Sequence, residues 1–355
     1  PASFVQEEWL SFQNGEEYAV EVNLTEVYLI KGALDIDALV KSFHTVMKRH
    51  ESLRTTFNIY SIPPSQIIHP EPIVTPRIID LQHLSPQQQK SHYEKLVIDE
   101  SKTRFNSVKG PLLKVYLIKL SEQENVLLII SHHLVVDGWS MGILHRELSA
   151  LYDAFLNSTH PALPNLEAQY ADYATWERSA TMGKLSKLSR YWRNQFQGLE
   201  TIGIKLPLDY PYLGEYSRSA SVLRQELDQS IYTNIQAICL LKNSSPFSFL
   251  FAVYLVLLYK YSETEDLLVT CPYATREHSK LENVIGWFSQ QIYLRIRLSP
   301  RYTFNDLLDR VNKKFLEVQE HQLAPRTLFE KLIPVVDMKQ PYFRVGFSLE
   351  YYKKR

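Results

Sequence analysis

The chain has 355 residues, 45% of them hydrophobic, which is ample for a large core and exceeds one usual domain length. Lysine plus arginine and aspartate plus glutamate both number 39, and no basic run occurs, so we expect neither nucleic acid nor a membrane as a partner. Two cysteines are too few for a disulfide framework or a four-ligand zinc site, which fits a reducing compartment and predicts a cytoplasmic protein.

The first residues, PASFVQEEWLSF, lack the basic start and the uninterrupted apolar run of a signal peptide. We interpret them as an excised or mid-chain start. The most apolar segment, residues 246–261, is shorter than the ~20 residues of a membrane span. We therefore predict a buried core helix there.

Strands and helices alternate along the first part of the chain. After a short strand, Asp35 can cap a helix whose apolar residues recur at helical spacing, namely Ile36, Leu39, Phe43 and Val46. Ser85 begins a capping box with proline in the first turn, which predicts a second helix toward Phe105. Residues 110–120 and 125–131 then predict a β-hairpin.

The rest of the chain predicts a second mixture of helices and strands. Helical spacing follows Gly138 and returns over residues 170–196, and residues 206–216 have the proline and glycine of a connector. The elements predicted beyond the connector are a strand at 221–227, helices near 229–241 and 246–261, strands at 266–273 and 291–299, a helix capped by Thr303, and a closing strand at 342–352.

Two adjacent histidines and an Asp-Gly pair follow the second hairpin strand, at His132, His133, Asp137 and Gly138. An unpaired polar group costs several kcal/mol in apolar surroundings, so these residues need partners or a function. Consecutive strand residues point to opposite faces, so both histidines face one pocket only if the strand has already ended. The alternative to a functional site is a structural one, in which a buried histidine simply pairs with Asp137. A metal site is not supported, because no third ligand lies at a familiar spacing.

The segment SHHLVVDGWS resembles the His-His-x-x-x-Asp-Gly motif of condensation domains in non-ribosomal peptide synthetases. Further matches follow in the family's order and cover nearly the whole chain. They are RHESLRTTF (49–57), FNSVKGPLLKV (105–115), YADYATWER (170–178), PYATRE (272–277), VIGWFSQQIYLR (284–295) and QPYFRVGFSL (340–349).

The resemblance implies a mixed α/β fold of two chloramphenicol acetyltransferase-like lobes, arranged in a V with a central tunnel. We expect the N-terminal lobe at residues 1–178 and the C-terminal lobe at 179–355, with the latter incomplete at its C-terminus. The implied reaction joins a donor acyl or peptidyl thioester to an acceptor aminoacyl thioester through an amide bond. The implied partners are upstream and downstream carrier domains with 4'-phosphopantetheine arms, and an adenylation domain of the same multienzyme. The domain itself is expected to bind no cofactor and no metal.

The family's catalytic assignment falls on His133, as a general base or as a hydrogen-bond acceptor that positions the amine. By the same resemblance Asp137 is mainly structural and pairs with Arg276 across the lobes, and Gly138 leaves room for the substrate and offers its N–H to the oxyanion. The expected site also contains His132, and its substrate-contacting or structural residues include Trp139, Ser140 and Arg54.

The chain departs from the family's pattern at several positions. Thr275 replaces the usual glycine before the arginine, Ser289-Gln290-Gln291 stands where Val-Asn-Thr is common, and Leu323 replaces an aspartate. These departures leave the pocket details open.

Two alternatives to condensation stay open on the sequence. An epimerization domain would need a second acid-base group, for which the matched motifs offer no clear glutamate. An inactive docking module normally loses the second histidine or the glycine, and both are present here.

Overall fold

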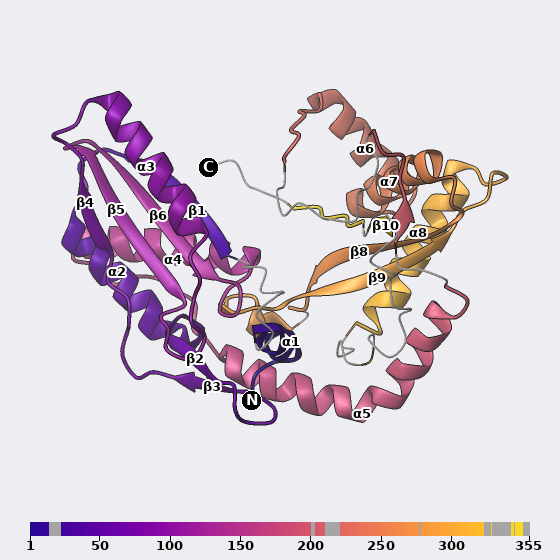
Figure 1. The fold of residues 1–355 in the computed structure, drawn as a ribbon, viewed down its shortest axis with the longest axis horizontal. Helices are drawn as coiled ribbons and strands as arrows, with labels where there is room; N and C mark the ends of the chain where they lie inside the picture. The colour runs from indigo at the N-terminus through magenta and orange to yellow at the C-terminus, as the bar shows by residue number, and fades with distance from the viewer. Residues whose placement is uncertain are drawn as a thin grey trace. The chain divides into compact units, whose positions relative to one another are not determined.

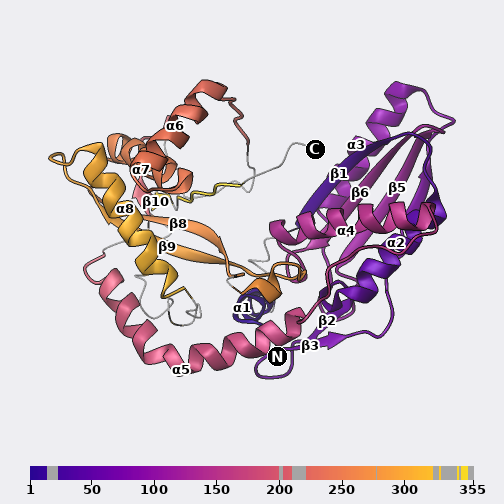
Figure 2. The same ribbon diagram turned by 180° about the vertical axis from the view of Figure 1, so that it is seen from behind.

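The computed structural model describes residues 1–13, 23–199, 203–209, 221–276, 278–322, 328, 342–343 and 345–350. These form two compact units (Figures 1 and 2). Unit 1 comprises Pro1–Gly183 and Ala274–Ser289, and unit 2 comprises Lys184–Tyr273 and the chain from Gln290 onward. The sequence prediction divided the chain after residue 178 and left segment 274–289 in the second lobe. That segment belongs to unit 1, where its backbone N–H groups are hydrogen-bonded to Asp137 and Ser140.

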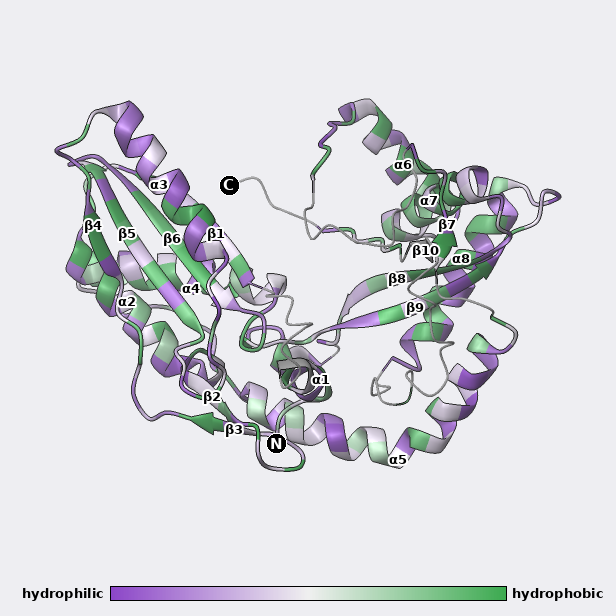
Figure 3. Cartoon of the chain, in the orientation of Figure 1, coloured by the Kyte–Doolittle hydropathy of each residue, from purple (hydrophilic) through white to green (hydrophobic). Residues whose placement is uncertain are grey.

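A four-stranded sheet forms the centre of unit 1. Its order is β1 (Asn23–Lys31), β6 (Glu124–His132), β5 (Leu113–Ser121) and β4 (Arg77–Asp80). β6 runs antiparallel to both neighbours, and β4 is parallel to β5. β5 and β6 are the predicted hairpin, and nearly every residue of β6 is buried. In Figure 3 much of β5 and β6 is green, the colour of hydrophobic residues.

Helices cover both faces of this sheet. α2 (Ile36–Arg49) and α4 (Gly138–Leu156) lie on one face and α3 (Pro86–Ser101) on the other (Figures 1 and 2). The predicted caps are confirmed: the carboxylate of Asp35 accepts a hydrogen bond from the N–H of Ala38, and Ser85 forms a capping box. The other elements of unit 1 are α1 (Phe4–Gln13), a 3₁₀ turn (Glu51–Arg54), the paired strands β2 (Thr55–Asn58) and β3 (Ser65–Ile68), a 3₁₀ turn (Ser279–Leu281), and the first half of α5 (Tyr170–Phe196).

Unit 2 contains a second apolar core. Strands β8 (Asp266–Ala274) and β9 (Ser289–Arg297) pair with each other, and α7 (Pro246–Ser262) and α8 (Phe304–Gln319) contribute buried side chains to the same core. α7 is the predicted core helix, begun by Ser245, whose hydroxyl caps the helix. α6 (Gln229–Leu241) precedes it, and β7 (Ile204–Lys205) pairs with β10 (Tyr342–Phe343). Within the described ranges, no single helix is long and apolar enough to span a membrane, although the bent pair α6–α7 passes that test jointly.

Two predicted strands of unit 2 are wrong in part or in whole. Residues 221–227 are irregular and exposed, with Leu223 95% accessible, because none of the described strands pairs with them. Of the predicted closing strand, Tyr342–Phe343 form β10 and Gly346 bridges to Thr270, while 347–350 are irregular. The connector from residue 210 on, and the departure at position 323, lie outside the described residues.

Candidate active site

The histidine pair lies where β6 ends. His132 is the last strand residue, His133 begins a turn, and Gly138 is the first residue of α4. The predicted order of strand, loop and helix is therefore confirmed. Because the strand has ended at His132, the side chain of His133 is free of the strict alternation of faces that a strand imposes.

His132 is part of the core of unit 1. Its ring nitrogen Nδ1 accepts a hydrogen bond from the backbone N–H of Leu134 at 3.1 Å, and the indole Nε1 of Trp9 lies 3.3 Å from its Nε2. The ring of Phe105 contacts it edge-on. Burial, with a smaller contribution from the charge of His133, lowers the pKa of His132 to about 4. The ring is therefore neutral at physiological pH.

His133 is half-buried and lies against Trp287 of segment 274–289. The two ring centroids are 4.4 Å apart, with an angle of 32° between the planes. Burial lowers the pKa of His133, and the negative charge of Asp137 opposes part of that shift. Since the imidazole is neutral at physiological pH, one of its ring nitrogens has a free lone pair that accepts a proton or a hydrogen bond.

Asp137 connects α4 to segment 274–289. Its Oδ1 accepts hydrogen bonds from the N–H of Ser140 at 2.8 Å and from Nη2 of Arg276 at 3.0 Å. Its Oδ2 accepts from Nη1 of Arg276 at 2.8 Å and from the backbone N–H groups of Phe288 and Ser289 at 3.0 and 3.2 Å. Burial alone would raise the pKa of Asp137, but the Arg276 charge and these hydrogen bonds hold it below its usual range. The carboxylate therefore stays ionised.

The ion pair between Asp137 and Arg276 is deeply buried, with both side chains 2% exposed. The predicted pairing of Asp137 with Arg276 is confirmed, and both residues belong to unit 1, so the pair lies within one unit. The guanidinium also lies over the ring of Phe288, 4.1 Å from its centroid. This pair is a buried polar link between the histidine loop and segment 274–289.

Ser140 adds a second link to the same segment. Its hydroxyl oxygen lies 2.7 Å from Oδ1 of Asp137 and 2.8 Å from the carbonyl oxygen of Gly286, and it accepts from the N–H of Gly286 at 3.0 Å. A Cβ atom at Gly286 would lie 2.0 Å from Cδ2 of Tyr170, so the tyrosine ring packs directly on the glycine backbone. The hydroxyl of Tyr170 donates to the carbonyl of Trp287 at 2.6 Å.

Sequence reasoning missed the contribution of Gly286, Trp287 and Tyr170 to the site. The available signal was the pair of motifs that contain these residues, YADY and IGWF. Their contact joins positions more than a hundred residues apart, which no local pattern reveals.

Gly138 and Trp139 lie at the exposed start of α4. A Cβ atom at Gly138 would meet nothing within 4 Å, so the space beside the glycine is open. Trp139 is 54% exposed, and its indole N–H donates to the carbonyl of Glu282 at 3.1 Å.

Arg54 makes local contacts in the 3₁₀ turn that precedes β2. Its guanidinium donates to the carbonyl of His69 and lies 3.9 Å from the carboxylate of Glu51. These contacts hold the end of the β2–β3 hairpin. The structure gives Arg54 no contact with His133 among the described residues.

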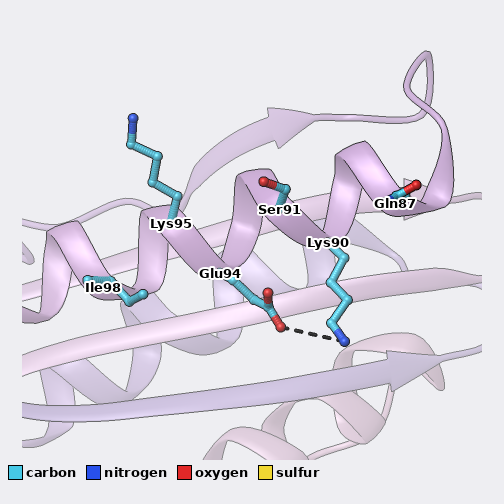
Figure 4. A pocket seen from close by; sticks show the side chains of 6 residues that line it. All are labelled: Gln87, Lys90, Ser91, Glu94, Lys95 and Ile98. Atoms are coloured by element: carbon cyan, nitrogen blue, oxygen red, sulfur yellow. Dashed lines mark ion pairs between the residues drawn. The ribbon is translucent and has the colours of Figure 1, made fainter.

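Two surface hollows lie away from the motif residues. One follows α3, with an ion pair between Lys90 and Glu94 (Figure 4); its lining is Gln87, Lys90, Ser91, Glu94, Lys95 and Ile98. The other lies in unit 2 and is lined by Asn194, Gln195, Gln197, Arg295, Arg297 and Lys314. Neither contains a residue of the histidine motif. Among the described residues, no three His, Cys, Asp or Glu side chains are grouped as metal ligands would be.

Comparison with known structures defines the fold class. The chain is similar to the X-domain from teicoplanin biosynthesis, with a TM-score of 0.80 and 24% identity over 98% of this chain and 76% of that one. It is also similar to the first condensation domain of the calcium-dependent antibiotic synthetase, with a TM-score of 0.78 and 15% identity over 99% and 82% of the two chains. The predicted mixed α/β, chloramphenicol acetyltransferase-like fold is confirmed.

Sequence comparison defines the family. The condensation domain model matches residues 1–355. Gramicidin S synthase 2 of Brevibacillus brevis is 31% identical over 99% of this chain, and surfactin synthase subunit 1 of Bacillus subtilis (strain 168) is 30% identical over 99%. The chain spans 8% and 9% of the length of these two relatives. The chain belongs to the condensation domain family of non-ribosomal peptide synthetases, whose function is peptide-bond formation.

Proposed function

We propose that this domain forms the amide bond between a donor acyl or peptidyl thioester and an acceptor aminoacyl thioester. The observation that carries the proposal is the neutral imidazole of His133, which lies in the turn that joins β6 to the exposed glycine at the start of α4. The proton acceptor and a glycine that leaves its backbone open to a substrate therefore belong to the same short loop.

The chemistry needs modest help from the protein. The α-amine of the acceptor has a reference pKa of about 8, so a substantial fraction is already nucleophilic near neutral pH. His133 orients this amine and accepts its proton as the nitrogen attacks the thioester carbonyl. The tetrahedral intermediate then collapses, the C–S bond breaks, and the proton goes to the departing thiolate. General base catalysis supplies about 10²- to 10⁴-fold, and positioning supplies as much.

The oxyanion of that intermediate also needs stabilisation. Gly138 is the first residue of α4, and the first N–H groups of a helix have no partner within the helix. We assign the N–H of Gly138 to the oxyanion, helped by the positive end of the helix dipole. Asp137, Arg276 and Ser140 have the supporting role of holding the loop and segment 274–289 together.

The proposed partners are carrier domains that deliver both substrates on 4'-phosphopantetheine arms, so no cofactor is bound by the domain itself. Two observations support this. The curated relatives are proteins many times longer than this chain, and the same fold occurs within a four-domain non-ribosomal peptide synthetase structure, of which it covers 26%. We extend the proposal to an adenylation domain in the same multienzyme and to a cytoplasmic location.

A docking module without catalysis is the second candidate. The teicoplanin X-domain, which has the same fold, forms a complex with a protein named OxyB. The intact His133 and Gly138 favour catalysis over this alternative.

The test offers the protein a loaded donor carrier and a loaded acceptor carrier in deuterated buffer and follows both by intact-protein mass spectrometry. Transfer of the donor group to the acceptor carrier supports condensation. Deuterium entering one aminoacyl group without transfer identifies epimerization instead. Carrier binding with neither change identifies a docking module.

A further inference from the structure

The buried Nδ1 of His133 has no side-chain hydrogen-bond partner among the described residues. In most histidine-based sites a carboxylate or carbonyl holds one ring nitrogen, which fixes the ring and leaves the other nitrogen for chemistry. Here Nδ1 is buried and makes no hydrogen bond of ordinary geometry to the described residues. The backbone oxygens of His133 and Val136 lie close enough to raise the pKa of the ring.

The nearest carboxylate is already committed elsewhere. Both oxygens of Asp137 accept hydrogen bonds from Arg276, Ser140 and the backbone of segment 274–289. Asp137 therefore influences His133 through its charge and does not orient the ring in the manner of a catalytic triad.

The aromatic contact that His133 does make is with Trp287. The indole lies against the imidazole with centroids 4.4 Å apart and planes inclined by 32°, so one face of the histidine is covered. Such a contact restricts rotation of the imidazole about its side-chain bonds.

Trp287 is itself held from several directions. Its Nε1 donates to the hydroxyl of Ser289 at 3.1 Å, and its carbonyl accepts from the hydroxyl of Tyr170 at 2.6 Å. The indole of Trp9 meets it at an angle of 66°. The preceding residue, Gly286, is packed under the Tyr170 ring. A side chain fixed in this way is a firm surface for the histidine.

We propose that Trp287 is a positioning residue that holds the imidazole of His133 with Nε2 directed toward the acceptor amine. This inference rests on the proposed function, in which His133 acts on that amine. Its contact adds to the effect of the backbone oxygens near the ring, and it keeps water from one face of the imidazole.

The test uses three substitutions of different shape. Trp287→Phe keeps an aromatic face, Trp287→Leu keeps apolar bulk without that face, and Trp287→Ala removes both. Trp176→Ala is the matched control, because Trp176 is 54% exposed on α5 and contacts Tyr173 instead of the site. Single-turnover transfer between loaded carriers gives the rate and the half-saturating concentration of acceptor carrier. Histidine labelled with ¹⁵N, with the His133 signals identified from His133→Gln, gives the pKa and tautomer of the ring.

We expect Trp287→Ala and Trp287→Leu to lower the maximal rate by about 10- to 100-fold, the scale expected for a misplaced catalytic group. The half-saturating concentration of acceptor carrier should stay unchanged. Trp287→Phe should restore most of the rate. In Trp287→Ala the pKa of His133 should rise toward its reference value of about 6.5, because the ring becomes hydrated. The midpoint of the pH–rate profile should rise with it.

Equal rates for Trp287→Leu and the wild type, or an unchanged His133 pKa and tautomer in Trp287→Ala, would overturn the proposal. If Trp287→Ala does not fold, the comparison of the leucine and phenylalanine variants decides. If the wild type transfers nothing, the proposed function fails. The nuclear magnetic resonance measurements then still decide whether Trp287 orients His133.

Discussion

Replacing Gly286 with alanine should disturb the site without touching any residue that contacts the substrate. The new Cβ would lie 2.0 Å from Cδ2 and 2.5 Å from Cγ of Tyr170, far inside contact distance. Tyr170 has little freedom to move, because it is 1% exposed, its hydroxyl is bonded to the carbonyl of Trp287, and its ring meets Phe288 edge-on. The strain must therefore displace segment 274–289.

The size of the effect follows from overpacking of a buried contact, which costs about 1–3 kcal/mol. In a unit of this size each kcal/mol lowers the melting temperature by about 2–4 °C, so Gly286→Ala should lose about 2–12 °C. Transfer activity should fall as well, because the backbone amide of Phe288, two residues along, is bonded to Asp137. Calorimetry and single-turnover transfer measure the two losses.

Two variants isolate the cause. Gly183→Ala, in the interior of α5 with nothing within 4 Å of the new Cβ, should stabilise the protein by about 0.5–1 kcal/mol. In a Tyr170→Ala background the clash is removed, so adding Gly286→Ala should cost much less than it does in the wild type. An unchanged melting temperature for Gly286→Ala, or the same loss in both backgrounds, would refute the reasoning.

Three further predictions concern the histidine loop. Asp137→Ala leaves Arg276 buried without its partner and should lower the free energy of unfolding by roughly 3–5 kcal/mol, measured by chemical denaturation; full stability with lost activity would instead make Asp137 a catalyst. Gly138→Leu should fold normally by circular dichroism, since a Cβ at this position meets nothing within 4 Å. The variant should keep carrier binding in titrations but lose transfer, because the leucine side chain fills the substrate's space. Normal turnover would contradict this placement of the substrate. The free energy of unfolding should fall by up to about 3 kcal/mol as the pH is lowered from 6.5 to 4. The reason is that His132 has its ordinary pKa in the unfolded chain but a pKa of about 4 in the folded protein. The same pH dependence in His132→Gln would count against this cause.

The parts of the fold that the sequence predicted are those fixed by nearby residues. The cap at Asp35, the capping boxes at Ser85 and Thr303, and the β5–β6 hairpin all depend on residues a few positions apart. Their patterns are visible in the sequence because local hydrogen bonds and side-chain periodicity decide them.

The failures lie where distant residues decide the outcome. The segment at 221–227 has strand-like composition, yet a strand also needs a neighbour to accept its hydrogen bonds. Segment 274–289 belongs to unit 1 because Asp137 binds the backbone amides of Phe288 and Ser289. Such contacts cannot be recognised in a sequence, because every residue except proline has a backbone N–H. The contacts of Trp287 with His133 and of Gly286 with Tyr170 could not be predicted either, because they join positions more than a hundred residues apart.

The central claim is that His133 carries amide-bond formation, and single-turnover transfer by His133→Ala tests it most directly. The donor group is followed from its loaded carrier to the acceptor carrier, with matched folding of variant and wild type verified by circular dichroism. The account predicts that the variant folds normally and transfers at least about 100-fold more slowly than the wild type. A transfer rate equal to that of the wild type would contradict the account.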